Sequence, residues 1–124
     1  MGNALKEPSA PIYNDEGLID FKKLKEVLGL TYPEVAQLID TTTAVVKAKK
    51  TSSSADTKAK RIKYICELLA PLVDKDPVRM KKWFRGPKPY WYGMSPIESM
   101  LNDNFDAVIE ELERIYHGEG PGNQ

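Results

Sequence analysis

The sequence predicts an all-α protein, and three features of its 124 residues support this fold class. Apolar residues recur at three- and four-residue spacing in nearly every segment that follows residue 17. Residues that begin helices well, such as Ser, Thr and Asp, stand immediately before several of these segments. No segment alternates apolar and polar residues in the way that is typical of a strand. We therefore expect about six to eight helices, packed mainly as one body.

The first two predicted helices lie between residues 20 and 39. The first has one apolar face, made of Phe21, Leu24, Val27 and Leu28. Gly29 ends it, because glycine readily adopts the left-handed conformation that commonly follows a helix. The second begins at Thr31, which forms a capping box with Glu34. Its apolar stripe is Val35, Leu38 and Ile39.

A short third helix is expected from Thr42 to Lys49, and the sequence TSSSAD then interrupts the helical pattern. Either Ser54 or Asp56 would cap the helix that follows. That helix carries the longest apolar stripe in the chain, formed by Ile62, Ile65, Cys66, Leu69, Leu72 and Val73. Because Cys66 lies within this stripe, we interpret it as a small core residue rather than a reactive thiol.

Two strong start signals mark the C-terminal third of the chain. Asp76 and Pro77 combine a helix cap with a first-turn proline and open another helix. The proline-rich segment GPKPYWYG is predicted to be a loop. Ser95, Pro96 and Glu98 then combine a cap, a first-turn proline and a capping-box glutamate. The last helix carries Phe105, Val108, Ile109, Leu112, Ile115 and Tyr116.

The composition argues against an enzyme. The single cysteine excludes an internal disulfide, and the single histidine, His117, leaves no Cys and His set for a zinc site. His117 precedes Gly118 at the end of the last helix, where a histidine more often caps the helix than acts as a base. The sequence contains no phosphate-binding glycine loop, GxSxG motif or Cys-His pair. We expect neither catalysis nor a cofactor.

The chain is also expected to be cytoplasmic and not associated with a membrane. No apolar run approaches the roughly 20 residues of a membrane span. The N-terminus lacks the apolar core of a signal peptide.

Charge is unevenly distributed, although 18 basic and 18 acidic residues cancel overall. Residues 41–63 hold seven basic side chains and one acidic, whereas residues 98–124 hold seven acidic and one basic. Such a split suggests an anionic partner for the first segment and a cationic one for the second. Two solvated helix faces would produce the same pattern, so charge alone leaves both interpretations open.

The predicted helices at 32–39 and 42–49 have the spacing of a helix-turn-helix, with Asp40 and Thr41 as the connection. In this interpretation Ala36 lets the two helices approach each other. Asp40 takes the left-handed position that glycine usually holds, and Val46 faces inward. The residues that would face a DNA groove are Thr42, Thr43, Lys47 and Lys50.

Two observations count against sequence-specific DNA binding. Lys49 stands where such motifs usually bury an apolar residue. Ala44 and Ala48 lie on the proposed recognition face, which has no Arg, Asn or Gln to contact base edges. Lysines contact phosphates more readily than they specify a sequence. Binding to operator DNA therefore stays open, as does a scaffold module that binds no DNA.

Two segments, WFRGPKPYWYGMSPIESML and VIEELERIYHG, resemble the C-terminal domain of the Xre/MbcA/ParS-like antitoxins. The match is close over residues 77–118 and looser over residues 20–118. The positions in register are Trp83, Phe84, Pro87, Trp91, Gly93, Ser95, Pro96, Ile97, Leu101, His117 and Gly118. The sequence departs from the family at Lys88, where asparagine is usual, and at Met100, where leucine or a similar residue is usual.

The resemblance implies an antitoxin of a type II toxin–antitoxin system, partnered by a RES-domain or ADP-ribosyltransferase-like toxin. In this family the C-terminal domain and tail cover the active-site cleft of the NAD-consuming or ADP-ribosylating toxin, and the N-terminal unit often represses the operon. The expected organisation is a flexible arm at 1–17, a helix-turn-helix unit at 18–75, a toxin-binding domain at 76–118 and a flexible tail at 119–124. The competing function is a stand-alone transcription regulator whose C-terminal domain only dimerises it.

The aromatic run at residues 90–92 is expected to divide between core and surface. Trp91 occupies an apolar position of the family and should point inward, against Trp83. Its two tyrosine neighbours should be partly exposed, as aromatic residues at protein interfaces often are. The predicted toxin-binding residues are Tyr90, Tyr92, Arg114, His117 and Gly118. We also expect a homodimer through the C-terminal helices.

Overall fold

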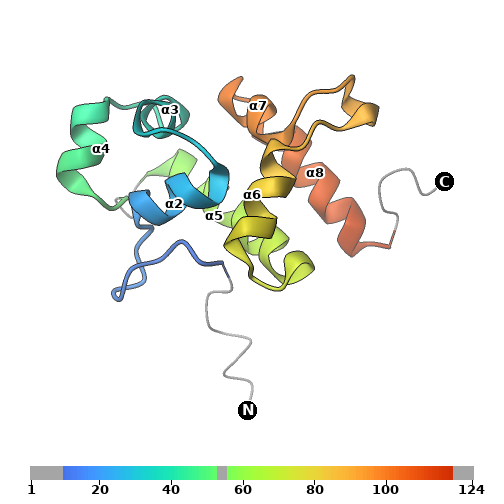
Figure 1. Ribbon diagram of the computed structural model, residues 1–124, viewed down its shortest axis with the longest axis horizontal. Helices are drawn as coiled ribbons and strands as arrows, with labels where there is room; N and C mark the ends of the chain where they lie inside the picture. The colour runs from blue at the N-terminus through green and yellow to red at the C-terminus, as the bar shows by residue number, and fades with distance from the viewer. Residues whose placement is uncertain (1–9, 53–55, 119–124) are drawn as a thin grey trace, which may run out of the picture.

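The computed structural model describes residues 10–52 and 56–118, and the regular secondary structure in these ranges is helical (Figure 1). The helices are α2 (Phe21–Leu28), α3 (Tyr32–Leu38), α4 (Thr43–Lys49), α5 (Thr57–Leu69), α6 (Pro77–Arg85), α7 (Pro96–Leu101) and α8 (Phe105–Tyr116), with 3₁₀ turns at Ala70–Val73 and Pro89–Trp91. Extended pairing within the described ranges is limited to two isolated bridges, Tyr13 with Ile19 and Asp20 with Thr51. The predicted all-α fold class is confirmed.

Local capping interactions set the bounds of the first helices, as predicted. The Asp20 carboxylate accepts a hydrogen bond from the Lys22 N–H at 2.8 Å at the start of α2. Gly29 ends this helix with a φ of 71°, in the left-handed region. Thr31 and Glu34 form the expected capping box at the start of α3. These bounds are therefore determined by residues within a few positions of each helix end.

α5 is shorter than its apolar stripe predicts. Asp56 caps it by accepting a backbone N–H of the first turn at 3.1 Å, while the alternative cap, Ser54, lies outside the described residues. The helix ends at Leu69, because Pro71 has no N–H to continue an α-helical hydrogen-bond ladder. Leu72 is consequently exposed, and its predicted place in the buried stripe is wrong.

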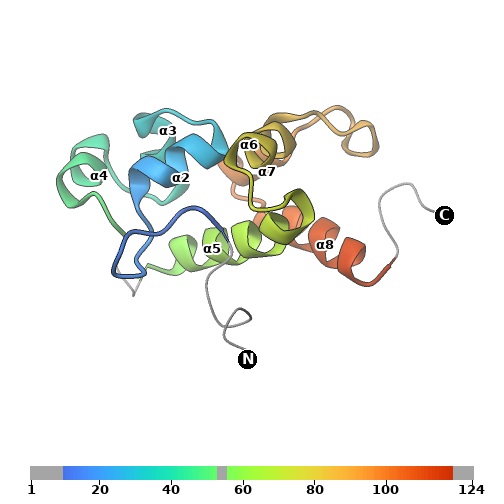
Figure 2. The same ribbon diagram turned by 60° about the horizontal axis from the view of Figure 1, so that its bottom comes forward.

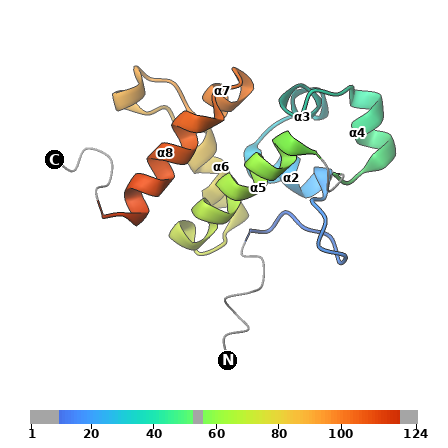
Figure 3. The ribbon, with the colours of Figure 1, turned by 180° about the vertical axis from the view of Figure 1, so that it is seen from behind.

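One hydrophobic core joins helices from both ends of the sequence. α2 packs on α6 (Figure 2), and α5 packs on α8 (Figure 3). The largest fully buried apolar side chains are Phe84, Phe105, Ile12, Leu24, Leu28, Ile62, Ile65, Leu69, Met80, Met100 and Leu112. Cys66 is also completely buried, as predicted, and burial raises the pKa of its thiol. A thiol in this environment is inert.

Residues 10–17 are packed on the body of the protein. Ala10 and Ile12 are buried in the core. The Tyr13 hydroxyl donates a hydrogen bond to the carboxylate of Glu67 in α5, and the Lys23 ammonium donates to the Tyr13 carbonyl at 2.7 Å. These contacts correct the expectation of a flexible arm for residues 10–17, because its apolar side chains reach the core. Residues 1–9 and the predicted tail at 119–124 lie outside the described residues.

The core buries Phe84 rather than either tryptophan. Phe84 has no exposed surface, whereas Trp83 and Trp91 are partly buried and pack against the edge of the core. The rings of Trp83 and Phe84 meet edge to face, with 5.4 Å between their centroids. The inward orientation expected for Trp91 is therefore met only in part. Its place in a 3₁₀ turn of the α6–α7 loop keeps some of the indole in solvent.

Candidate functional site

α4 is anchored by one buried side chain, which leaves most of its surface in solvent. Of its seven residues Val46 alone is buried, which confirms its predicted inward orientation. The Thr42 hydroxyl accepts a backbone N–H of the first turn at 3.2 Å, so this predicted DNA contact also caps the helix. Thr43 is half-buried, and Lys47 and Lys50 are exposed. The four predicted DNA-binding residues thus lie together on one short helix and its ends.

Three lysines contribute to a hollow between α2 and α4. The hollow has a volume of about 420 Å³, and its lining is Asp20, Phe21, Lys22, Tyr32, Val46, Lys47 and Lys50. The ammonium groups of Lys25 and Lys47 lie 5.2 Å and 5.7 Å from the centroid of the Tyr32 ring. Sequence spacing does not reveal the contributions of Lys22, Lys25 and Tyr32, because nothing local shows that α2 lies beside α4.

The backbone of Lys88 closes the loop between α6 and α7. Its N–H donates to the Met94 carbonyl at 3.0 Å, and its carbonyl accepts the N–H groups of Trp91 and Gly93, both at 2.9 Å. Tyr92 and Gly93 have φ angles of 57° and 83°, in the left-handed region. A Cβ at Gly93 would meet no atom within 4 Å. Backbone conformation rather than space therefore favours glycine at this position.

This loop presents large apolar side chains to solvent. Tyr92 is fully exposed, and Met94 is 39% exposed. An open hollow of about 510 Å³ lies beside them, lined by Tyr92, Gly93, Met94, Glu98, Leu101 and Asn102. The predicted exposure of Tyr92 is confirmed, while the side chain of Tyr90 lies outside the described part of the structure. An exposed aromatic ring at the tip of a loop is typical of a protein interface.

Ser95, Pro96 and Glu98 hold the C-terminal end of this loop. The Ser95 hydroxyl accepts the Glu98 N–H at 3.2 Å, and the Glu98 carboxylate accepts the Ser95 N–H at 2.8 Å. Ser95 and Pro96 are buried, so the capping box fixes the loop to the body of the protein. Pro87, near the other end of the loop, is exposed. These motif residues shape the surface on which Tyr92 stands.

Lys88 stands where the family that the sequence resembles has asparagine, and its side chain has a partner of its own. The ammonium lies 5.0 Å from the centroid of the Trp83 ring. Desolvation lowers the pKa of Lys88, and the negative charge of Glu111 opposes this shift. Lys88 thus connects the loop with α6 and lies within electrostatic reach of α8.

α8 contains a buried carboxylate. Glu111 is 1% exposed and accepts a hydrogen bond from the Arg114 guanidinium at 2.6 Å. The Arg114 side chain is 40% exposed, so it contacts both Glu111 and solvent. His117 is the exposed C-cap of α8, and Gly118 follows with a φ of 80°. The three-residue spacing of Glu111 and Arg114 permits this pair, but the burial of Glu111 could not be predicted from it.

The two sets of predicted site residues lie at opposite ends of the molecule. In Figure 1, α4 is at the left end of the long axis, whereas the α6–α7 loop and α8 are at the right. Thr42, Thr43, Lys47 and Lys50 belong to the first end. Tyr92, Arg114, His117 and Gly118 belong to the second. The two predicted sets are therefore separated along the long axis of the molecule.

Two features of other protein classes are not found in the described residues. No helix within residues 10–52 and 56–118 has the length and apolar character needed to cross a bilayer. In the same ranges, His, Cys, Asp and Glu side chains do not gather in a group of three that could hold a metal ion.

Comparison with solved structures finds a likeness of fold. The chain is similar to a chain in the crystal structure of the M. tuberculosis MbcT-MbcA toxin-antitoxin complex, with a TM-score of 0.56 and 19% sequence identity, over 78% of this chain and 90% of that chain. No protein-family model matches the sequence, and no curated protein does. The fold that the sequence resemblance implies is therefore found in a solved toxin–antitoxin complex.

Proposed function

We propose that this chain is an antitoxin, which binds a toxin protein and neutralises it. The observation that carries the proposal is the likeness of its fold, over 78% of its length, to a chain of a toxin–antitoxin complex. The motif from Trp83 to Glu98 supports it separately, because that motif holds a loop whose aromatic tip faces solvent. Neutralisation by covering an active site needs a complementary surface and no catalytic group, so the proposed role is that of a binding protein rather than an enzyme.

The proposed toxin-binding surface begins at the α6–α7 loop. Exposed large apolar side chains next to a hollow favour association with another protein, because docking removes them from water. Tyr92 and Met94 meet this condition, and the polar residues Glu98 and Asn102 also line the hollow. We place Tyr90, Tyr92, Arg114, His117 and Gly118 on this surface.

The proposed toxin is an enzyme that consumes NAD, of the RES type, or that transfers ADP-ribose. A cleft that binds NAD needs positive charge for the two phosphates. α8 carries Glu110 exposed to solvent, Glu113 half-exposed, and Asp106, which is exposed and paired with Arg61. This acidic surface is complementary to such a cleft, which is why we propose that the C-terminal end of the chain covers the active site.

Replacing Tyr92 by alanine is expected to weaken toxin binding while leaving the fold intact. Because the Tyr92 side chain is fully exposed, its removal takes little from the core. The loss of an interface aromatic should reduce the binding free energy by about 1–2 kcal/mol. Full-length chain used to capture its partner from the native host identifies the toxin, and calorimetric titration with the purified toxin measures the change.

Val78→Ala is the control for this experiment. Val78 is also an exposed apolar side chain, but it lies in the first turn of α6, at the opposite end of that helix from the α6–α7 loop. The control should bind the toxin as tightly as the parent chain. Equal affinity for Tyr92→Ala and the parent would remove Tyr92 from the interface, and capture of no toxin would count against the antitoxin function itself.

A second proposed function is DNA binding through α4, which would allow repression of the operon. The observation that favours it is the hollow with Lys22, Lys47 and Lys50 in its lining and Lys25 beside it. Lysines around an open hollow suit a phosphate backbone. A stand-alone transcription regulator would keep this activity and bind no toxin, so the capture experiment separates the two alternatives.

Removing the charges of Lys47 and Lys50 is expected to weaken binding to all DNA sequences alike. Lys47→Gln and Lys50→Asn should each lower the salt dependence of binding by about one counterion, because each lysine would contact one phosphate. Asparagine suits residue 50, whose φ is 65°. Fluorescence anisotropy with duplexes of unrelated sequence, at several salt concentrations, measures both effects.

Lys82→Gln on α6 is the control for these variants, since Lys82 is an exposed lysine on another helix. It should leave the salt dependence unchanged. A loss confined to one duplex sequence would contradict the phosphate role of Lys47 and Lys50. Identical affinities for parent and variants would remove the basic surface from DNA binding.

A further inference from the structure

The turn between α3 and α4 holds an aspartate in a conformation that usually belongs to glycine. Asp40 has a φ of 59°. Its N–H donates to the Gln37 carbonyl at 3.2 Å, and the N–H of Thr41 donates to the Ala36 carbonyl at 2.9 Å. This pair of hydrogen bonds is the Schellman pattern, in which the left-handed residue after the helix is most often glycine.

The turn between α7 and α8 repeats the same geometry. Asp103 has a φ of 65°. Its N–H donates to the Met100 carbonyl at 2.9 Å, and the N–H of Asn104 donates to the Ser99 carbonyl at 2.8 Å. A residue with a Cβ is less stable than glycine in this conformation. Each of these turns therefore accepts a backbone cost and presents a carboxylate in place of glycine.

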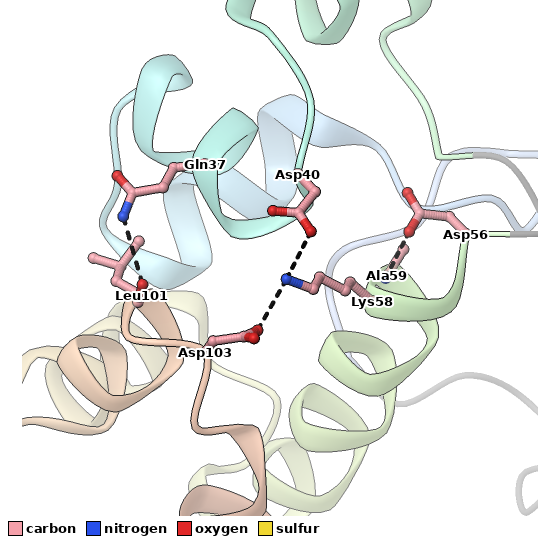
Figure 4. Close-up of polar contacts among 7 residues, drawn as sticks. All are labelled: Gln37, Asp40, Asp56, Lys58, Ala59, Leu101 and Asp103. Atoms are coloured by element: carbon pink, nitrogen blue, oxygen red, sulfur yellow. Dashed lines mark hydrogen bonds and ion pairs between the residues drawn. The ribbon is translucent and has the colours of Figure 1, made fainter.

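Both carboxylates are directed at one ammonium group. Lys58, in the first turn of α5, lies 2.9 Å from the Asp40 carboxylate and 2.9 Å from that of Asp103 (Figure 4). The hydrogen bonds to Asp103 and Asp40 raise the pKa of Lys58, so it stays charged. Beside this bridge the Gln37 amide donates to the Leu101 carbonyl at 3.5 Å.

The bridge reaches α4, which contributes little to the core. α4 has a single buried side chain, Val46, so its placement depends on its packing against α3 and on its two ends. At its C-terminal end the Lys50 carbonyl accepts the Phe21 N–H at 2.9 Å. At its N-terminal end, the turn at Asp40 is joined through Lys58 to the α7–α8 turn at Asp103. α5 and α8 already have another link, the ion pair of Arg61 with Asp106, whereas Lys58 extends the connection to α3 and α4.

We propose that Lys58 is a positioning residue that couples α4 to the α7–α8 turn through paired contacts with Asp40 and Asp103. A partner that displaces either carboxylate from Lys58 changes the restraint on α4. The consequence, communication between a toxin bound at the C-terminal end and DNA bound at α4, rests on the proposed function. The coupling itself does not.

Amide hydrogen exchange of the full chain tests this coupling without toxin or DNA. Lys58→Met keeps the aliphatic stem and removes the charge, and it should raise exchange in residues 43–50 by about two- to fivefold, the effect of losing one or two partly exposed ion pairs. Exchange in α8 serves as the internal reference. Its rate should rise only as far as the loss of global stability, measured by urea unfolding, accounts for. Lys58→Arg should restore the parent exchange in α4.

The decisive measurement is the effect of the α7–α8 turn on amide exchange in α4. The substitution Asp103→Asn removes the charge and keeps a residue that tolerates the left-handed conformation. Asp103→Asn alone should raise exchange in α4 by a smaller factor than Lys58→Met, and the double variant should exchange no faster in α4 than Lys58→Met alone. Lys60→Met is the matched control on α5, because Lys60 makes no ion pair among the described residues, and it should leave α4 unchanged. An Asp103→Asn effect that is independent of Lys58, or a Lys58→Met effect spread evenly over all helices, would overturn the proposal.

Discussion

Phe84→Ala is expected to lower the free energy of unfolding by about 3–5 kcal/mol, the usual cost of truncating a fully buried phenylalanine. Phe84 has no exposed surface and lies in the hydrophobic core that joins helices from both ends of the sequence. Its ring also meets Trp83 edge to face, so the substitution leaves a cavity and removes an aromatic contact. Urea unfolding followed by circular dichroism measures the loss.

Two further variants define where this effect comes from. Phe84→Leu retains most of the apolar volume and should cost only about 1–2 kcal/mol. Trp91→Ala should cost less than Phe84→Ala, because Trp91 is only partly buried. A larger loss for Trp91→Ala than for Phe84→Ala would show that the indole, not the phenyl ring, is the main anchor of the C-terminal helices.

Arg114→Met is expected to destabilise the protein by about 1–3 kcal/mol. The Glu111 side chain is 1% exposed, and its carboxylate accepts a hydrogen bond from the Arg114 guanidinium at 2.6 Å. The substitution removes this donor. Breaking a buried ion pair from one side is costly because the remaining carboxylate stays buried without that partner. The charge of Lys88, which acts on Glu111, offsets part of this cost. The expected loss is below that of a fully buried pair, since Arg114 is 40% exposed and solvent screens it. Thermal and urea unfolding of the variant measure it.

The double variant Glu111→Gln with Arg114→Met provides the control. Without the carboxylate there is no buried charge to leave behind, so part of the stability should return relative to Arg114→Met alone. Strictly additive losses would contradict the assigned pair. The same variants bear on toxin binding, because a weaker complex with Arg114→Met reports an interface contact only if the variant remains folded under the conditions of the titration.

The helices of this protein follow from interactions that its sequence displays locally. Asp20, Thr31 and Ser95 cap helices because each side chain reaches backbone N–H groups two or three residues away. Gly29 ends α2 because its own φ permits it. The apolar spacing of α2 specifies its buried face, and that of α8 specifies Phe105, Val108 and Leu112. Tyr116, which the same spacing placed in the stripe of α8, is 46% exposed. All these features depend on neighbours within one or two helical turns.

Parts of the candidate site were equally accessible to sequence reasoning. Three consecutive aromatic residues in one short loop cannot all turn inward. The family resemblance, which gives Trp91 the apolar position, then predicted an exposed Tyr92, and Tyr92 is fully exposed. The exposure of Lys47 and Lys50 and the burial of Val46 follow from helical spacing. Whether these surfaces bind toxin and DNA remains the subject of the proposals above.

Only the tertiary structure decided which of several similar side chains is used. It placed Phe84, rather than Trp83 or Trp91, in the core. Of the acidic residues in the described part of the C-terminal segment, it buried Glu111. It brought Tyr32 beside lysines of α2 and α4, and it joined Asp40 and Asp103 through Lys58. The physical reason is that burial and ion pairing depend on contacts between segments far apart in the chain. Local spacing specifies which face of each helix is apolar, but the packing of whole helices determines what that face meets.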